Sequence, residues 1–509
     1  MMTSRFRLKV TPAVLLSFLY FCLLFLWLGK NRLLGLDESW YADVARAEVL
    51  GGHWFPLYFQ GHIFWDKPPL IPWLQGISLI VGGMNETALR IWSALAGALS
   101  IYWVYRLGAF FAKDEKAGFL CALALMLEPH FILSSRIATL DMPLFACLLG
   151  FWWQWTQAFD PNASTPRKHL LAAGLLSTAA IGVKSWSGLI FLPAALAMLF
   201  LERPKTFDKQ TLLTRFFLPI GLTFLAWFSF YAAIFGKSYF AWEWHFNLTE
   251  RVRDGGFSST HTLIHALKFY AVILQEGLPF LWPLIPLGLG LWVRESWAQW
   301  KEKRRFDLAM GILFFLYYTI LLVFFMATLI NYFLPLMAVG VLGLAFLIRF
   351  QSEPRVRLAG ILSLLLALLN GSTEFRYMEW VFISSLLIGC LPFIPIFSRK
   401  ALKPYWVYGL SALWFAALGY KAQDYLRHPP DPNRVWVAEV LAHPAQTKGQ
   451  PLLFVGKETD ARALEFYSDY KVTALDQFPT TRPAEALLFE VNHRAVFLPA
   501  PGSVSARRN

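Results

Sequence analysis

The stretch that decides the fold is residues 11–70, where an apolar run, Thr11–Gly29, is followed by Asp37-Glu-Ser-Trp-Tyr41-Ala-Asp-Val-Ala-Arg46 and then by Asp66-Lys67-Pro68-Pro69-Leu70. The apolar run is long enough to cross a bilayer, which takes about 20 mostly apolar residues. It follows a basic N-terminus, and no small-residue cleavage site comes after it. It therefore predicts a retained first transmembrane helix rather than a signal peptide, with the polar segment emerging directly from that span.

The composition of the whole chain agrees with a membrane protein. Of its 509 residues, 57% are hydrophobic and only 16% are charged, whereas soluble proteins carry about 25% charge. The net charge of +13 comes from short basic clusters between apolar runs, which is typical of membrane orientation signals and not of nucleic-acid binding. The four cysteines all lie inside apolar segments without metal-type spacing, so we expect neither a disulfide framework nor a cysteine metal site.

Apolar runs predict a mainly α-helical integral membrane protein with about 13 spans. The predicted spans are residues 11–29, 88–111, 117–133, 142–158, 170–183, 186–201, 216–235, 270–293, 308–326, 331–348, 358–370, 380–397 and 405–420. With the N-terminus in the cytoplasm, the inner connections carry the basic excess and the outer ones hold most of the loop acids. An odd number of spans places the C-terminus outside.

We therefore expect two domains. Residues 1–420 form the membrane domain, with a first outer loop over 30–87 and a second long outer loop over 236–268. Residues 421–509 form a small extracytoplasmic α/β domain. In it, 451–455 and 495–498 have the composition of short buried strands, and 460–467 that of a helix.

The first outer loop holds the strongest candidates for chemistry. Asp37 opens a predicted helix over 37–50 that Gly51 and Gly52 stop, and the tandem prolines hold Lys67 at the membrane–water boundary. Asp37 has an alternative role as a helix N-cap, and Lys67 as a cation that extends to the lipid headgroups. Together, a carboxylate and an ammonium at one interface suit a reaction between a lipid phosphate and a hydroxyl.

Other candidates lie further along the chain. Asp141 precedes a new span, where helix capping is the alternative role, and Lys184 lies between two apolar runs. An ionisable residue at that depth is a functional candidate by default. Arg251 in the second long loop suits phosphate. Two histidines flank it, His245 and His265, but such isolated histidines are weak indicators of a metal.

The pattern Asp-Glu-x-x-Tyr-Ala-x-x-Ala-Arg, followed by Asp-Lys-Pro-Pro-Leu-x-x-Trp, resembles the first periplasmic loop of bacterial membrane glycosyltransferases of the GT-C fold. These include the protein O-mannosyltransferases and the lipid A aminoarabinose transferase. The resemblance continues through Ala88–Ala94 and Ser135–Leu144, and more weakly through Val183-Lys184, His245–Arg251 and Asn331–Pro335. The C-terminal domain matches only in placement.

The resemblance implies a role for each matching residue. Asp37, Lys67 and Asp141 are expected to be catalytic, with Lys67 on the donor phosphate and Asp141 as the acid of the second loop. The residues expected to bind substrate or support the charges are Glu38, Tyr41, Arg46, Asp66, Arg90, Arg136, Lys184, His245 and Arg251. Some relatives hold a metal between a histidine and the acid before Lys-Pro-Pro, here Asp66 and His265. The sequence favours an enzyme that requires no cofactor, with a divalent metal as the weaker alternative.

Two departures from the family pattern bear on the substrates. The family often has Lys-Gly where this chain has Lys184-Ser185, and often has a lysine near Thr328. The loss of that second cation leaves the identity of the anionic donor or acceptor open. The first-loop signature is unaffected.

These observations predict a glycosyltransferase of the inner membrane that moves a hexose or pentose from a polyprenyl-phosphate donor to lipopolysaccharide, another lipid or protein on the outer face. Its expected partners are membrane lipids, the donor and an envelope glycolipid or protein acceptor, without nucleic acid, and we expect a monomer. Asp37 would act as a general base for a hydroxyl acceptor, but would only position a phosphate acceptor. A lipid-linked sugar flippase and a non-catalytic scaffold are the rival classes. A transporter would usually show internal repeats, and none is found in the sequence.

The loop charges give a testable topology. Single cysteines at positions 113, 203 and 301 should be protected from an impermeant thiol reagent in intact cells, in a background without the four native cysteines. Cysteines at positions 60, 254 and 460 should react. Labelling at position 301, or protection at position 460, would reverse the predicted orientation.

Overall fold

The computed structural model describes residues 11–30, 32–33, 35–59, 61–202, 207–236, 239, 241, 284–303, 333–353, 356, 450–455, 470–475 and 487–490. These residues form two compact units, which are treated separately below. The first contains the chain up to Leu23, Leu95–Ser135 and the described residues from Asp141 to 356. The second contains Leu24–Ala94, Arg136–Leu140 and the C-terminal strands.

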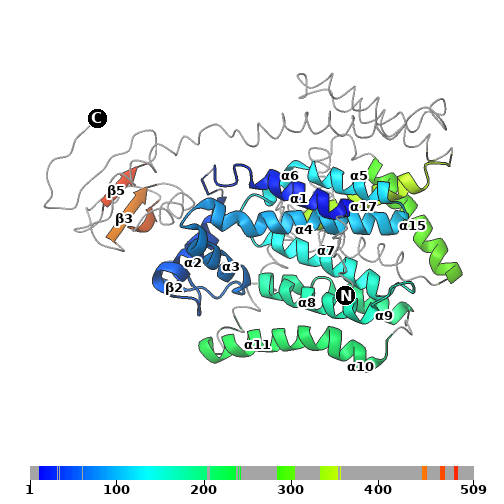
Figure 1. Cartoon of the computed structure of the whole chain (residues 1–509). Helices are drawn as coiled ribbons and strands as arrows, with labels where there is room; N and C mark the ends of the chain where they lie inside the picture. Colours follow the sequence, from blue (N-terminus) through cyan, green and yellow to red (C-terminus); the bar gives the residue numbers. More distant parts are fainter. Residues whose placement is uncertain are drawn as a thin grey trace, which may run out of the picture. The chain divides into compact units, whose positions relative to one another are not determined.

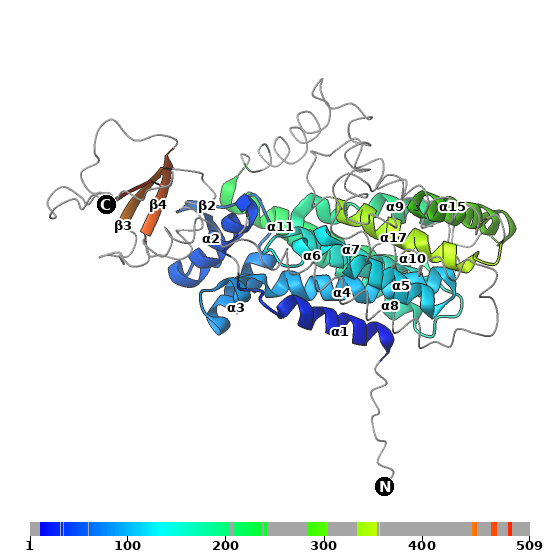
Figure 2. The ribbon, with the colours of Figure 1, turned by 90° about the horizontal axis from the view of Figure 1, so that it is seen from above.

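The first unit is a bundle of helices (Figures 1 and 2). Its elements are α5 (Glu115–Met126), α6 (Pro129–Ser134), α7 (Asp141–Ala158), α8 (Pro166–Lys184), the 3-10 helix Ser185–Leu189, α9 (Leu192–Glu202), α10 (Lys209–Leu212), the π-helix Leu213–Phe217, α11 (Leu218–Phe235), α15 (Leu284–Lys303) and α17 (Leu334–Arg349). Two helices are shared between the units, α1 (Pro12–Phe25) and α4 (Glu86–Ala112).

The bundle is held by helix pairs that pack closely. Helix α7 packs against α8, and α15 against α17. A Cβ at Gly288 on α15 would overlap the carbonyl group of Gly343 on α17, so these two backbones meet without an intervening side chain. At one end of this pair Arg349 donates from Nη2 to Oε1 of Glu295 at 2.6 Å, which fixes the two helices in register.

Several predicted spans coincide with these helices, but two, those over 117–133 and 186–201, are interrupted. The second is divided between the 3-10 helix Ser185–Leu189, which continues α8, and α9, which begins at Leu192. Three described helical segments are long and apolar enough to cross a membrane, namely Glu86–Ala112, Pro166–Leu189 and Lys209–Phe235. The predicted span over 117–133 is divided into α5 and α6, because Glu128 caps a new helix that begins at Pro129. Its carboxylate accepts from the backbone N of Phe131 at 2.5 Å and lies 2.7 Å from Nδ1 of His130. The predicted spans 308–326, 358–370, 380–397 and 405–420 lie outside the described residues.

The described residues of the second unit include two helices of its own and two small sheets. Its elements are α2 (Gly35–Gly51), β1 (Tyr58–Phe59), β2 (His62–Ile63), α3 (Leu70–Gly82), β3 (Gln450–Val455), β4 (Tyr470–Leu475) and β5 (Leu487–Glu490). Helix α2 confirms the helix predicted over 37–50. The short strands β1 and β2 are antiparallel, and β3 pairs in parallel with β4 on one side and β5 on the other. Strand β3 matches the strand predicted over 451–455, whereas 460–467 and 495–498 lie outside the described residues.

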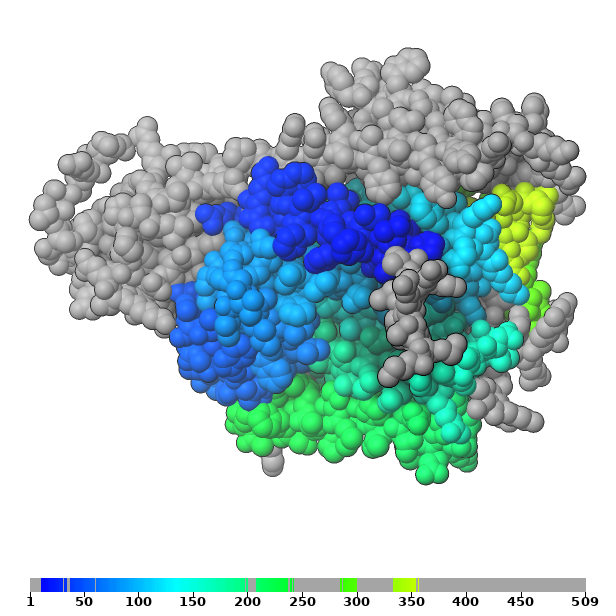
Figure 3. Space-filling view, viewed as in Figure 1, coloured from blue at the N-terminus to red at the C-terminus, as the bar shows by residue number. Residues whose placement is uncertain are grey.

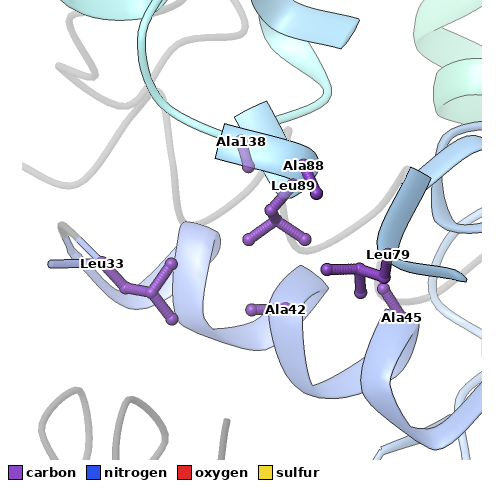
Figure 4. Packing of buried hydrophobic residues seen from close by; sticks show 7 residues of the cluster. All are labelled: Leu33, Ala42, Ala45, Leu79, Ala88, Leu89 and Ala138. Atoms are coloured by element: carbon purple, nitrogen blue, oxygen red, sulfur yellow. The ribbon is translucent and has the colours of Figure 1, made fainter. Parts of the chain in front are cut away.

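A small apolar cluster joins α2 to α3 and to the start of α4 (Figure 4). Ala42 and Ala45 lie on one face of α2, opposite Leu79 of α3 and Leu89 of α4. Alanine has no side chain beyond Cβ, so these helices approach closely. Ala138, from the short segment between α6 and α7, completes the cluster.

Unlike the apolar residues of this cluster, Glu48 is acidic. It lies one turn after Ala45 on α2 and is fully buried, and neither of its carboxylate oxygens has a hydrogen-bond partner among the described residues. Its Oε2 lies against Gly76 of α3, where a Cβ would overlap it. Burial raises the pKa of Glu48 from 4.5 to about 9, so this side chain is a neutral acid at pH 7.

The raised pKa makes stability depend on pH. The folded state binds the proton more tightly than the unfolded chain does, so this contribution is complete below pH 4.5 and is lost as pH rises toward 9. Glu48→Gln keeps the shape of the neutral acid but needs no proton on folding. At pH 7, which is 2.5 units above the unfolded pKa of 4.5, binding that proton costs about 3 kcal/mol, so the substitution should raise the free energy of unfolding by up to that amount. Thermal unfolding in detergent between pH 5 and 9 measures the effect. The matched control is Glu115→Gln, at an exposed carboxylate. A pH dependence that is equal in wild type and Glu48→Gln would contradict this assignment.

Candidate active site

The first turn of α2 carries two adjacent acids with opposite environments. Asp37 is exposed, whereas Glu38 is fully buried. Glu38 lies one turn before Ala42, on the α2 face that packs inward, while Asp37 is rotated by about 100° from it around the helix. One residue of the Asp-Glu pair is thus enclosed by protein and the other is presented outward.

Glu38 is held by a bidentate ion pair with Arg90 on the first turns of α4. Nε of Arg90 donates to Oε1 at 2.7 Å, and Nη2 donates to Oε2 at 3.0 Å. Arg90 is 2% exposed. The planar guanidinium matches the two carboxylate oxygens, and the pair is closed to water.

Further hydrogen bonds extend this pair to two other segments. Arg90 donates from Nη1 to the carbonyl of Leu28 at 2.9 Å and from Nη2 to the carbonyl of Arg32 at 2.8 Å. The backbone N of Ala138 donates to Oε1 of Glu38 at 2.8 Å. The pair therefore ties α2 and α4 to the chain leaving α1 and to the segment between α6 and α7.

Arg136 makes a similar connection to the end of α1. Its Nη1 donates to the carbonyl oxygens of Leu24 and Leu26 at 2.8 and 3.1 Å, and its Nη2 to that of Trp27 at 2.7 Å. These carbonyls lie in the last turn of α1 and just beyond its end at Phe25, and a cation is favourable at that position. Arg90 and Arg136, expected to support substrate charges, thus have protein partners in the structure.

Lys67 follows the small hairpin and precedes the tandem prolines. It is 5% exposed, and its Nζ lies 2.6 Å from Oδ2 of Asp66. Pro68 and Pro69, which follow Lys67 in the sequence, are also buried, and α3 begins directly after them at Leu70. Lys67 is therefore a fixed cation and not an extended surface side chain.

Asp66 gives limited support for a metal. Its Oδ1 is buried and has no hydrogen-bond partner among the described residues, whereas Oδ2 is taken by Lys67. One available carboxylate oxygen does not make a metal site, which usually takes four ligands or more. No cluster of three or more His, Cys, Asp or Glu suited to a metal is found in the described part of the chain. The other predicted ligand, His265, lies outside it.

Asp141 and Lys184 form a second buried pair, in the helical bundle of the first unit. Asp141 is the first residue of α7 and Lys184 the last of α8, and Nζ of Lys184 donates to Oδ1 of Asp141. Both side chains are more than nine-tenths buried. The carboxylate of Asp141 is thus engaged by a cation rather than by the first turn of its own helix.

The residue after Lys184, where this chain has serine and the family often has glycine, lies in an unusual backbone conformation. Ser185 has a φ of +47° at the point where α8 gives way to a 3-10 helix. Glycine adopts this left-handed conformation at little cost, while other residues are strained there. The glycine that the family often has at this position is therefore the residue that the backbone favours.

The remaining candidates divide into described and undescribed residues. Tyr41 is buried on α2 and Arg46 half-buried on the same helix, while His245 and Arg251 lie outside the described residues. Sequence reasoning missed Glu48. The signal was present, since Glu48 follows Ala42 and Ala45 on the apolar stripe of the predicted helix.

Comparisons with known proteins agree with this architecture. The profile of the dolichyl-phosphate-mannose-protein mannosyltransferase family matches residues 66–232. A protein of Aquifex aeolicus without an assigned function is 26% identical over 323 residues, which are 62% of this chain and 58% of the other. The undecaprenyl phosphate-alpha-4-amino-4-deoxy-L-arabinose arabinosyl transferase of Pseudomonas paraeruginosa is 34% identical over 87 residues, 17% of this chain and 16% of the other. These matches span less than two thirds of either relative.

The fold itself is shared with a solved structure. The crystal structure of ArnT from Cupriavidus metallidurans bound to undecaprenyl phosphate superposes with a TM-score of 0.63 at 16% identity, covering 92% of this chain and 86% of that one. The chain thus has an ArnT-like GT-C fold and is related to ArnT and to the mannosyltransferases. The number of spans and the separate C-terminal domain stay predictions.

The different environments of the two acids give a stability test. Glu38→Gln leaves the Arg90 charge buried without its counterion, which costs about 3–5 kcal/mol in comparable cases. Asp37→Asn, at the exposed neighbour, should change stability by less than about 0.5 kcal/mol. Thermal unfolding midpoints in detergent compare the two variants with wild type. Equal midpoints for both variants would show that the buried pair does not hold α2.

Proposed function

We propose that this protein transfers a sugar from a polyprenyl-phosphate donor to an envelope acceptor on the outer face of the inner membrane. The exposed carboxylate of Asp37, set in place by its buried neighbour Glu38, carries this proposal. Four segments of chain converge on Glu38 and Arg90, and this anchoring presents Asp37 from a rigid helix start. Catalysis depends on such fixed geometry, because positioning lowers the entropic part of the barrier.

Asp37 acts on the acceptor. With a hydroxyl acceptor, Asp37 takes the hydroxyl proton while the oxygen forms a bond to the anomeric carbon and the carbon–phosphate oxygen bond breaks. With a phosphate acceptor that is already ionised, no proton moves and Asp37 positions the acceptor. Polyprenyl phosphate leaves with the bonding electron pair in both cases.

Lys67 acts on that leaving group. Its ammonium is held by Asp66 and is largely buried, so little reorganisation is needed when negative charge develops on the phosphate. A preorganised cation at a site of low water content is worth more than one in solvent. Asp66 is a positioning residue in this scheme.

The other residues take supporting roles. Lys184, with Asp141 as its counterion, is a candidate cation for an anionic substrate group, and Tyr41 and Arg46 of α2 are candidate substrate contacts. We assign Glu38, Arg90 and Arg136 to positioning, because their hydrogen bonds connect protein segments. His245 and Arg251 are kept as candidate phosphate contacts.

The comparisons support the class of donor. Undecaprenyl phosphate is the carrier in the name of the Pseudomonas relative and is the ligand of the Cupriavidus ArnT structure. The basic inner loops support a cytoplasmic N-terminus with the C-terminal domain in the periplasm. We propose a monomer that requires no cofactor, with lipopolysaccharide or protein as the acceptor.

Two substitutions test these roles by transfer from purified polyprenyl-phosphate sugars to envelope acceptors in detergent. Lys67→Ala should lower the transfer rate by roughly a hundred- to a thousand-fold, the effect of removing about 3–4 kcal/mol of transition-state stabilisation. Asp37→Asn keeps the size of the residue and removes its charge, and should therefore lower transfer to a hydroxyl acceptor by roughly a hundred-fold or more. Lys116→Ala, at an exposed lysine of α5, is the matched control and should transfer at the wild-type rate.

The outcome also separates an enzyme from a transporter. Near-normal transfer by Lys67→Ala would leave that lysine without a role in the chemistry, and the same result for Asp37→Asn would leave Asp37 as an acidic residue of the first helical turn and no more. A wild-type protein that moves lipid-linked sugar across vesicles without cleaving the sugar–phosphate bond would exclude the transferase.

A further inference from the structure

Helix α3 has its polar and apolar side chains in the reverse of the usual arrangement. It carries no charged residue between Leu70 and Gly82. Its two polar side chains face the protein: Gln75 is buried, and Oγ of Ser78 donates to the carbonyl of Ala88 at 2.6 Å. A helix that faces water on one side normally directs such residues outward.

The outer face of α3 is entirely apolar. Trp73, Ile77, Ile80 and Val81 are 37%, 49%, 60% and 84% exposed. Successive side chains are rotated by about 100°, so these four lie within an arc of about 100° on one side of the helix. The space-filling view shows the blue segments that include α2 and α3 as part of the visible surface (Figure 3). Such a face implies an apolar environment, since a contiguous apolar patch is unfavourable in water.

The tryptophan at the start of this face is fixed. Nε1 of Trp73 donates to the carbonyl of Trp54 at 2.6 Å, so the indole N–H is satisfied inside the protein while the ring stays on the surface. Tryptophan is enriched where proteins meet the membrane–water interface, because the ring suits the headgroup level.

The length and the neighbours of α3 identify what covers its apolar face. Thirteen residues extend about 20 Å, whereas the hydrocarbon core is about 30 Å thick, so α3 does not cross the membrane. Helix α4 is long enough to cross the membrane, and it begins at Glu86, only four residues after α3 ends at Gly82. Phe25, Leu26 and Trp27 are also exposed, and Gly29 of that segment lies against Thr87 at the start of α4. Exposed apolar residues thus occur both on α3 and on the segment that packs against the start of α4, the helix that is long enough to cross.

We propose that the outer face of α3, formed by Trp73, Ile77, Ile80 and Val81, lies in the outer leaflet at the boundary between headgroups and acyl chains. Interfacial helices of this kind bury their apolar face about 5–10 Å deep. Lys67 and the two prolines directly precede α3, so this contact sets the depth of the Lys67 ammonium at the level of lipid phosphates. The membrane contact does not depend on the proposed sugar transfer.

Depth-dependent fluorescence quenching tests the contact. Single cysteines at positions 77 and 81 of the full-length protein, without its four native cysteines, would carry an environment-sensitive fluorophore in phosphatidylcholine vesicles. Lipids brominated on the acyl chain should quench both positions, at a depth of about 5–10 Å below the headgroups, and aqueous iodide should quench them weakly. The matched control is position 53, since His53 is exposed on the turn after α2. It should respond to iodide and not to brominated lipid.

Two results would overturn the proposal. Quenching of positions 77 and 81 by iodide, to the extent seen at position 53, would place α3 in water. Protection of both positions from iodide and from brominated lipid would show that protein covers the face, either a second copy of this chain or another partner. Retained sugar transfer alongside either result would leave the proposed function intact while removing the membrane contact.

Discussion

The ion pair between Glu38 and Arg90 is the interaction on which the packing of helix α2 depends. It joins the first turn of α2 to the first turns of α4, and its remaining hydrogen bonds reach the end of α1 and Ala138. Two charges removed from water carry a large desolvation cost, which only complete pairing offsets. Here both carboxylate oxygens have donors and the guanidinium also serves two carbonyls, so the pair satisfies backbone groups in the connections between helices.

In this arrangement two neighbouring residues have different environments, one buried and paired and the other exposed. Burial keeps Glu38 in one geometry, while Asp37, one position earlier, faces outward from the same rigid turn. The same principle applies to Asp66 and Lys67, where one residue of the pair fixes the other. A site on a loop gains precision in this way without an extensive core of its own.

The sequence predicted the local elements well and the long-range partners poorly. The helix over 37–50 and the strand over 451–455 follow from capping signals and residue composition, and both are found in the structure. The partner of Glu38 lies 52 residues away, and no local pattern specifies it. Helix α3 was not predicted separately because its 13 residues are too short for a span, and its inverted polarity is visible only once burial is known. Glu128 divides a predicted span because a cap and a proline outweigh the hydropathy of the segment.

The connections of Glu38 also constrain how the chain is made. Its guanidinium partner is synthesised 52 residues after it, and the backbone N of Ala138 100 residues after it. At translation rates of about 5–20 residues per second, these partners arrive roughly 3–10 and 5–20 seconds later. During that interval the ion pair that holds the first turn of α2 cannot form, because Arg90 has not yet been made. The turn that carries Asp37 and Glu38 therefore reaches its final contacts only after the chain through Ala138 has been synthesised.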